Sequence, residues 1–198
     1  MLRIGVMGGT FDPIHTGHLI LAQQALSELK LDKVLFITAS KPPHKLDSLI
    51  TQSKTRQKMA EAAIDGNNSF ELSDIEMKRS GASFTVDTLR ELKEYYKNDV
   101  ELFLLIGADE AAIFAGWKDP EIICTLAKVV VANRPGFDVD DAIISMPSSI
   151  TDKIIKLQIP GVDISSTQLR LMVKLEKAVK YLVPFKVEEL ITKEGLYK

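Results

Sequence analysis

Three histidines and a pair of glycines are the residues of this sequence whose types and spacing suggest chemistry. His15, His18 and His44 all lie in the first quarter of the 198-residue chain, and Gly8-Gly9 stands shortly before them. Glycines let backbone N–H groups approach a phosphate, and the start of a helix attracts the same anion. Two histidines three residues apart on a helix project from one turn. The pattern therefore predicts binding of a polyphosphate.

Two common glycine-rich nucleotide loops do not fit this spacing. A dinucleotide-binding fingerprint needs G-x-G-x-x-G and an acidic residue at the end of the next strand. Here the glycines are Gly5, Gly8 and Gly9, and the next predicted strand ends in TAS, residues 38–40. A Walker loop needs G-x-x-x-x-G-K-[ST], which the sequence lacks. Two alternatives stay open: a zinc site from the three histidines, although no Cys or Glu cluster completes it, and histidines that only cap helices.

The segments around these residues predict a strand, a glycine loop and a helix. Residues 2–7 form an apolar run, and residues 17–29 carry apolar side chains every three or four positions. Thr85 is the expected N-cap of a later helix, and the loop 39–51 contains Pro42-Pro43. We predict further strands at 34–38, 70–72, 102–106, 128–132 and 154–159, further helices at 53–65, 85–96, 167–177 and 186–193, and a loop with a short helix at 133–147.

Strands that alternate with helices predict an α/β fold with a doubly wound, mostly parallel, Rossmann-like sheet. In such sheets the ligand lies beyond the carboxyl ends of the strands, at a topological switch point. We find no internal repeat, low-complexity tract or interdomain linker. We therefore expect one domain over residues 1–198, with a small C-terminal helical part from about residue 165.

Composition and charge restrict the partners. Hydrophobic residues make up 45% of the chain and charged residues 26%, which is typical of a globular protein. Lys and Arg number 25 against 27 Asp and Glu, so the net charge of −2 argues against binding of duplex nucleic acid. No apolar run is long enough to span a bilayer, and the one cysteine, Cys124, cannot form an intramolecular disulfide. We expect a cytoplasmic protein that binds neither nucleic acid nor membrane; a homo-oligomer is compatible with the sequence.

Two motifs resemble a known superfamily. Residues 8–18, GGTFDPIHTGH, resemble the nucleotidyltransferase signature, whose first motif contains H-x-G-H or T-x-G-H, and the longer form is similar to that of bacterial nicotinate-nucleotide adenylyltransferases. Residues 164–170, ISSTQLR, match the second motif, I-S-S-T-x-x-R. Each motif opens a predicted helix. The resemblance implies a nucleotidyltransferase fold in which the two motifs face one nucleotide site.

The resemblance extends through most of the chain. Two departures stand in the helix after the second motif: Leu171-Met172 replaces a second basic residue, and Glu176 stands where relatives often have glycine. Both departures lie outside the phosphate-binding motif. The other similar stretches are SKPPHK at 40–45, SFTVDTL at 83–89, GAD at 107–109 followed by Trp117, RPG at 134–136, and YLVP at 181–184.

What the resemblance implies about function is specific. The 5′-phosphate of nicotinate mononucleotide attacks the α-phosphorus of ATP, pyrophosphate leaves, and deamido-NAD forms, a step of NAD biosynthesis. Mg²⁺ would arrive on the ATP phosphates, with no metal site in the protein. The implied catalytic residues are His15, His18, Lys45 and Arg170. The implied ATP-binding residues are Gly8, Gly9, Thr10, Phe11, Gly17, Asp109, Ile164, Ser165, Ser166 and Thr167. Those implied for nicotinate mononucleotide are Ser40, His44, Thr85, Trp117 and Arg134.

Several of these residues also have plainer interpretations. The single Trp117 is equally well explained as a core residue, Asp109 as a helix N-cap, and Arg134 as a turn residue before proline. For the whole chain, the alternatives are another adenylyl- or cytidylyltransferase of the superfamily, such as a pantetheine-phosphate adenylyltransferase, or a nucleotide sensor without catalysis. Residues 40–45, 83–89 and 107–117 favour nicotinate mononucleotide as the acceptor.

Overall fold

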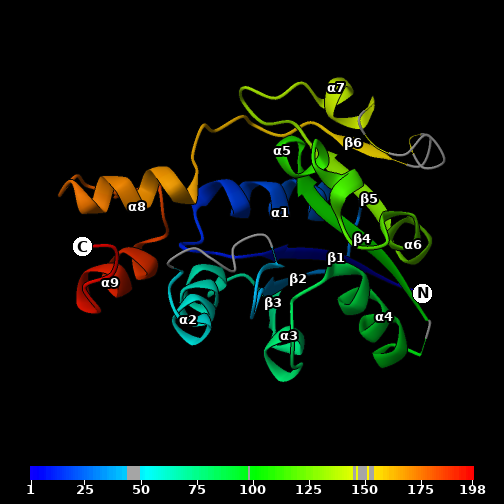
Figure 1. The fold of residues 1–198 in the computed structure, drawn as a ribbon, viewed down its shortest axis with the longest axis horizontal. Coiled ribbons are helices and arrows are strands. Elements are labelled where there is room, and N and C mark those ends of the chain that lie inside the picture. Colours follow the sequence, from blue (N-terminus) through cyan, green and yellow to red (C-terminus); the bar gives the residue numbers. More distant parts are fainter. Residues whose placement is uncertain (44–49, 98, 145, 147–150, 152–153) are drawn as a thin grey trace. The chain divides into compact units, whose positions relative to one another are not determined.

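The computed structural model of the protein describes residues 1–43, 50–97, 99–144, 146, 151 and 154–198. Its strands form one six-stranded sheet in the order β3-β2-β1-β4-β5-β6 (Figure 1). The pairs β1–β4, β4–β5 and β5–β6 are parallel. This order and the alternation with helices confirm the predicted doubly wound α/β fold. The strands are β1 (Leu2–Gly9), β2 (Lys33–Thr38), β3 (Phe70–Ser73), β4 (Val100–Gly107), β5 (Lys128–Ala132) and β6 (Ile155–Leu157).

The helices follow the predicted alternation, with several short additions. They are α1 (Thr16–Glu28), α2 (Ser53–Ile64), α3 (Ile75–Lys78), α4 (Thr85–Tyr95), α5 (Ala108–Ala111), the 3-10 turn η2 (Phe114–Gly116), α6 (Pro120–Leu126), α7 (Val139–Ile144), α8 (Ser166–Lys174) and α9 (Phe185–Lys193). The helices predicted at 17–29, 53–65 and 186–193 are confirmed to within one residue at each end. The short helix predicted within 133–147 is α7.

The chain forms two compact units, each built from three stretches of sequence. The first contains Met1–Met7, Ile20–Leu35 and Phe84–Asp163. Its core is made of the parallel strands β4 and β5, with α4 packed on α6 and α5 packed on α7. The expectation of one domain stays a prediction.

The second unit contains Gly8–Leu19, Phe36–Ser83 and Ile164–Lys198, and so holds both sequence motifs. Helix α2 packs against α9 and against β3 (Figure 1). The aromatic ring of Phe36 contacts those of Phe11 and Phe70, with centroids 6.1 and 5.1 Å away. The burial of these rings fixes the loop after β1 against the sheet.

One predicted N-cap and one predicted helix end are wrong for identifiable reasons. Thr85 is the first residue of α4 and not its N-cap: Phe84 has the extended backbone of the capping position and no side chain caps the helix. The helix predicted at 167–177 ends at Lys174, because Glu176 has a left-handed backbone with φ of 54°. That conformation favours glycine, which explains why a glycine suits this position in similar sequences.

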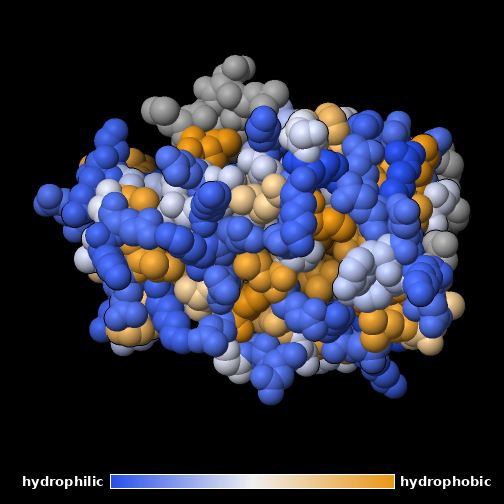
Figure 2. Space-filling model, turned by 90° about the horizontal axis from the view of Figure 1, so that it is seen from below, coloured by the Kyte–Doolittle hydropathy of each residue, from blue (hydrophilic) through white to orange (hydrophobic). Residues whose placement is uncertain are grey.

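The surface mixes polar and apolar residues. Figure 2 shows hydrophilic residues spread over one face between smaller apolar patches. Within the described ranges, no helix combines the length and the apolar composition needed to cross a bilayer.

Candidate active site

The loop after β1 is shaped by a glycine and an aromatic residue. Phe11 has a left-handed backbone, with φ of 50°, and its side chain is buried. A Cβ on Gly9 would lie 2.7 Å from the Phe11 ring. Only glycine fits there without displacing the ring, so this pair fixes the turn that leads to the two histidines.

The two histidines of the first motif lie against each other. Their ring centroids are 3.7 Å apart, and the His15 backbone N–H donates to His18 Nδ1 at 3.1 Å. The Phe11 ring meets the His18 ring edge to face at 5.1 Å. Because Nδ1 of His18 accepts a hydrogen bond, the neutral ring carries its proton on Nε2. The His18 ring is thus held in one orientation as a donor.

The second motif begins a helix with a complete cap. The Ser165 side chain accepts from the Gln168 backbone N–H, and the Gln168 side chain accepts in return from the Ser165 N–H. The capping box takes up the Gln168 N–H, while the N–H groups of Ser166 and Thr167 stand before the first intrahelical hydrogen bond of α8, which Leu169 donates to Ser165. A helix start of this kind attracts anions.

The two motifs meet within the second unit, although they lie near opposite ends of the sequence. The Ser166 hydroxyl donates to the carbonyl oxygen of Pro13 at 2.8 Å. Arg170 Nη1 donates to the carbonyl oxygen of Asp12 at 2.8 Å, and Nη2 donates to the Thr167 hydroxyl at 3.2 Å. One structural cluster therefore contains both histidines, the start of α8 and a guanidinium group.

The remaining predicted residues of this unit differ in their exposure. Gly8 is exposed, whereas Gly17 in the first turn of α1 and Ile164 before α8 are half-buried. The Ser40 N–H donates to the Ser83 hydroxyl at 2.9 Å. His44 and Lys45 lie outside the described residues.

A buried charged residue holds the loops after β1 and β2 through their backbone carbonyl groups. Arg56 of α2 is 2% exposed. Its guanidinium donates to three carbonyl oxygens: Thr10 at 2.6 Å, Thr51 at 2.8 Å and Ser40 at 3.4 Å. Burial lowers the pKa of Arg56, while the charge of nearby Asp12 opposes that shift. Since arginine stays protonated even so, the residue acts as a fixed positive clamp on backbone carbonyls.

The other predicted residues belong to the first unit. Asp109 follows the carboxyl end of β4 and forms an ion pair with Arg134. A Cβ on Gly107 would lie 2.5 Å from Asp109 Oδ1, so glycine leaves room for this carboxylate. Asp109 Oδ1 is buried and has no hydrogen-bond partner in the described part of the chain. Asp109 is the second residue of α5, whose N-cap is Gly107, so the N-cap interpretation is wrong.

Trp117 and the start of α4 are linked by a lysine. Lys118 Nζ lies 3.0 Å from Asp87 Oδ2 and 4.7 Å from the centre of the Phe84 ring, next to Thr85. Trp117 is half-buried, packs on Phe114 at 5.2 Å, and has a buried indole N–H without a partner among the residues described. A buried N–H in that state is unusual and is ready to donate.

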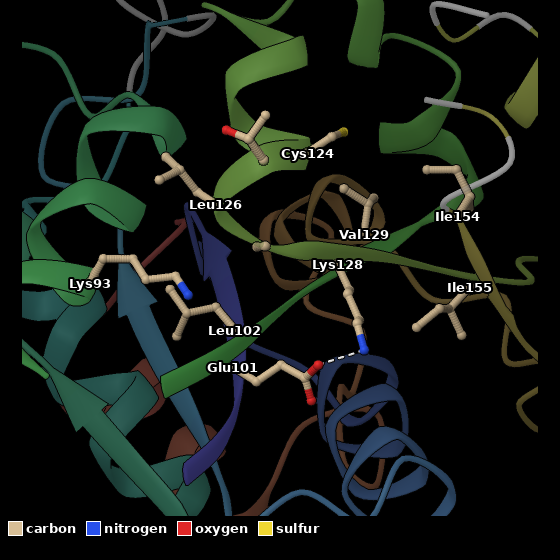
Figure 3. A pocket seen from close by; sticks show the side chains of 11 residues that line it. Lys93, Glu101, Leu102, Cys124, Leu126, Lys128, Val129, Ile154 and Ile155 are labelled. Atoms are coloured by element: carbon tan, nitrogen blue, oxygen red, sulfur yellow. Dashed lines mark ion pairs between the residues drawn. The ribbon is translucent and has the colours of Figure 1, made fainter. Parts of the chain in front are cut away.

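A cavity of about 530 Å³ lies elsewhere in the first unit (Figure 3). It is lined by the amino ends of β4 and β5, the opposite end of β4 from Asp109. Lys128 Nζ pairs there with Glu101 at 2.5 Å, and this hydrogen bond lowers the pKa of the Glu101 carboxyl. Of the predicted site residues in the first unit, Asp109 lies at the opposite end of β4 from this cavity, at the carboxyl edge where ligands bind in such sheets.

Within the described ranges, no group of three or more His, Cys, Asp or Glu is arranged to hold a metal ion. The described residues thus give no support to the zinc alternative, which also involves His44.

Comparison with known proteins identifies the family. The family model described as cytidylyltransferase-like matches residues 6–172. Proteins named probable nicotinate-nucleotide adenylyltransferase are 40% identical in Clostridium tetani and 41% identical in Thermus thermophilus, over 100% of this chain and of each relative. A third, from a Thermoanaerobacter species, is 40% identical over 100% of this chain and 95% of its own length. The chain belongs to the nicotinate-nucleotide adenylyltransferase family. This family membership makes it a nucleotidyltransferase.

Solved structures support the fold assignment. A Plasmodium falciparum nicotinic acid mononucleotide adenylyltransferase complexed with NaAD matches with a TM-score of 0.82, covering 100% of this chain and 98% of that one. The same enzyme complexed with APC matches with a TM-score of 0.81. Both are 20% identical to this chain, so they show a shared fold.

Sequence reasoning missed four residues that hold the first motif in place: Asp12, Thr51, Arg56 and Tyr197. For Arg56 a signal existed, since it shares the buried face of α2 with Met59, Ala60 and Ala63 at helical spacing. A charged residue on such a face requires internal partners. Tyr197 had no such signal, because its partner Asp12 is distant in the sequence.

Proposed function

We propose that this chain transfers the adenylyl group of ATP to nicotinate mononucleotide, giving deamido-NAD and pyrophosphate in NAD biosynthesis. The observation that carries the proposal is the hydrogen bond between Ser166 and Pro13, which joins the two nucleotidyltransferase motifs in one cluster. Full-length identity of about 40% to nicotinate-nucleotide adenylyltransferases supports the choice of acceptor.

The reaction needs alignment and charge stabilisation more than a protein nucleophile. The phosphate of nicotinate mononucleotide attacks the α-phosphorus in line, and pyrophosphate leaves on the opposite side. Both reactants are anions, so mutual repulsion and charge on the leaving group form the barrier. Orientation of two bound reactants contributes about 7–11 kcal/mol when the geometry is near ideal. Positive groups and N–H donors in fixed positions contribute the rest.

In the second unit, each group of the cluster has a defined role. His15 and His18 donate to oxygens near the α-phosphorus. The N–H groups at Ser166 and Thr167 hold the β- and γ-phosphates, because the start of α8 carries partial positive charge. Arg170 adds a cation there; its guanidinium keeps further N–H donors beyond the two that bind Asp12 and Thr167. Lys45 screens repulsion between the two substrates.

In the first unit, the roles concern the nucleosides. The unpaired Asp109 Oδ1 accepts from a ribose hydroxyl of ATP. The Trp117 ring stacks on the flat nicotinate ring, and N–H groups at the start of α4 near Thr85 face the nicotinate carboxylate. Arg134 of this unit, with Ser40 and His44 from other parts of the sequence, completes the set that the resemblance assigns to nicotinate mononucleotide. Mg²⁺ enters as part of the MgATP substrate, since this ion prefers phosphate oxygens and water to an all-protein cage.

Pyrophosphate release with different acceptors tests the proposal. The chain is incubated with MgATP and one of three acceptors: nicotinate mononucleotide, nicotinamide mononucleotide or phosphopantetheine. We expect the highest kcat/KM with nicotinate mononucleotide. A preference for phosphopantetheine would contradict the acceptor and leave adenylyl transfer intact. ATP binding without turnover on any acceptor would instead indicate a nucleotide sensor.

A further inference from the structure

The end of the chain contacts the first motif through one side chain. After α9 the backbone turns back, with left-handed residues at Gly195 and Tyr197. The Tyr197 hydroxyl donates to Asp12 Oδ1 at 2.7 Å and lies 3.8 Å from Met59 Sδ. Tyr197 is therefore hydrogen-bonded to the loop that leads to the histidines.

Asp12 is the point where three parts of the second unit meet. The residue is 4% exposed. Its Oδ1 accepts from Tyr197, its Oδ2 accepts from the Thr51 N–H at 3.2 Å, and its carbonyl oxygen accepts from Arg170. A buried carboxylate must keep its hydrogen bonds, because leaving one unmade carries a desolvation cost. The orientation of Asp12 is thus set by its partners.

Asp12 also lies shortly before the two histidines in the sequence. Pro13, whose carbonyl accepts from Ser166, follows Asp12, and the paired histidines come shortly after. Arg56 holds the neighbouring Thr10 and Thr51 carbonyls, so the loop is fixed on its other side. A displacement of Asp12 would move the Arg170 guanidinium and the His15–His18 pair relative to each other.

We propose that Tyr197 is a positioning residue for adenylyl transfer: through Asp12 it sets the relative placement of the two histidines and Arg170. This inference rests on the proposed function, because it assumes that those groups act on the ATP phosphates. It predicts that Tyr197, which lies outside both motifs, affects the rate of the reaction. Tyr197 touches no substrate in this account and acts only through the Asp12 carboxylate.

The test is Tyr197→Phe, which removes the hydroxyl and keeps the ring. We expect kcat to fall roughly tenfold or more, since small misalignments of reacting groups slow a reaction strongly. The KM for ATP should change less than threefold, because the start of α8 still binds the phosphates. Tyr95→Phe is the matched control: Tyr95 is 75% exposed and lies in the other unit, so its kcat should stay within twofold. Circular dichroism gives the folded fraction to which kcat is referred.

A double-mutant cycle separates positioning from a general loss of packing. If Tyr197 acts through Asp12, adding Tyr197→Phe to Asp12→Ala should lower kcat less than twofold further. Asp12→Asn, which keeps an oxygen acceptor for the hydroxyl, should retain more activity than Asp12→Ala. Additive losses, or a folded Tyr197→Phe with kcat within twofold of the wild type, would overturn the proposal. A wild-type chain without activity on any acceptor would overturn the proposed function and this inference together.

Discussion

The His18 ring is held from two sides, and this restraint fixes the direction in which it can donate a hydrogen bond. The backbone N–H of His15 occupies Nδ1, and the Phe11 ring meets the imidazole edge to face. The proton on Nε2 therefore points in one direction without further reorganisation. Preorganised donors of this kind account for much of the rate of enzymes that stabilise developing charge.

Replacement of His18 by alanine should reveal this contribution. We expect His18→Ala to lower kcat by about 10²–10³-fold, the usual loss when one preorganised donor to a transition state is removed. Steady-state pyrophosphate release measures the effect, with circular dichroism as the check of folding. Gln23→Ala on the exposed side of α1 is the control and should change kcat less than twofold. A loss below threefold in folded His18→Ala would remove the residue from the mechanism.

Single residues also show where sequence reasoning stops. His15 and His18 were singled out by their residue type and spacing, and Arg170 by the resemblance of residues 164–170 to a known motif. Asp12, Arg56 and Tyr197 act through contacts across the second unit: Arg56 binds Thr10 and Ser40, and Tyr197 binds Asp12. A long-range hydrogen bond leaves no periodicity in the sequence, which is why these residues were not predicted.

Helix α8 supplies the anion-binding start on which the proposal depends. Its capping box keeps the first turn helical although Ser166 and Thr167 are poor helix formers in a helix interior. The cap and the ligand site use adjacent backbone groups. A negative charge at the cap residue Ser165 should therefore weaken phosphate binding without weakening the helix.

Two substitutions of Ser165 test that separation. Ser165→Ala removes the acceptor of the Gln168 N–H and should lower the free energy of unfolding by about 0.5–2 kcal/mol, with a raised KM for ATP. Ser165→Asp should cap the helix as well as serine does, yet raise the KM for ATP, because its carboxylate repels the phosphates. Urea unfolding and steady-state kinetics measure the two effects. Unchanged ATP affinity in Ser165→Asp would show that the phosphates bind elsewhere.

Among the secondary-structure elements, the strands were predicted better than the short helices. β2 and β5 are short apolar runs, which predict buried strands, and the apolar residues of α2 recur at helical spacing. By contrast, α3, α5 and α6 span four to seven residues, too few to show a periodic pattern. The N-cap of α4 was predicted wrongly because a threonine near a helix start is not always the cap: here Phe84 takes that position.

For the complete chain, the alternation of strands and helices was enough to predict the sheet class, and two motifs were enough to predict the family. The sequence did not show which separated stretches of the chain fold together into each unit. The second unit joins three separated stretches. The first carries the loop before the histidines and the other two support it: Arg56 from the middle stretch, Arg170 and Tyr197 from the last. A unit of this kind carries its binding groups on segments that only the folded chain brings together.

In the proposed mechanism, residues 8–18 and 164–170 bind the same triphosphate. Amide hydrogen exchange of the wild-type chain, measured with and without MgATP and with no acceptor present, tests it most directly. We predict that MgATP slows exchange in both segments together, at the same ATP concentration, while the exposed part of α1 around Gln23 is unchanged. Slower exchange in only one of the two segments, or in neither, would contradict the account.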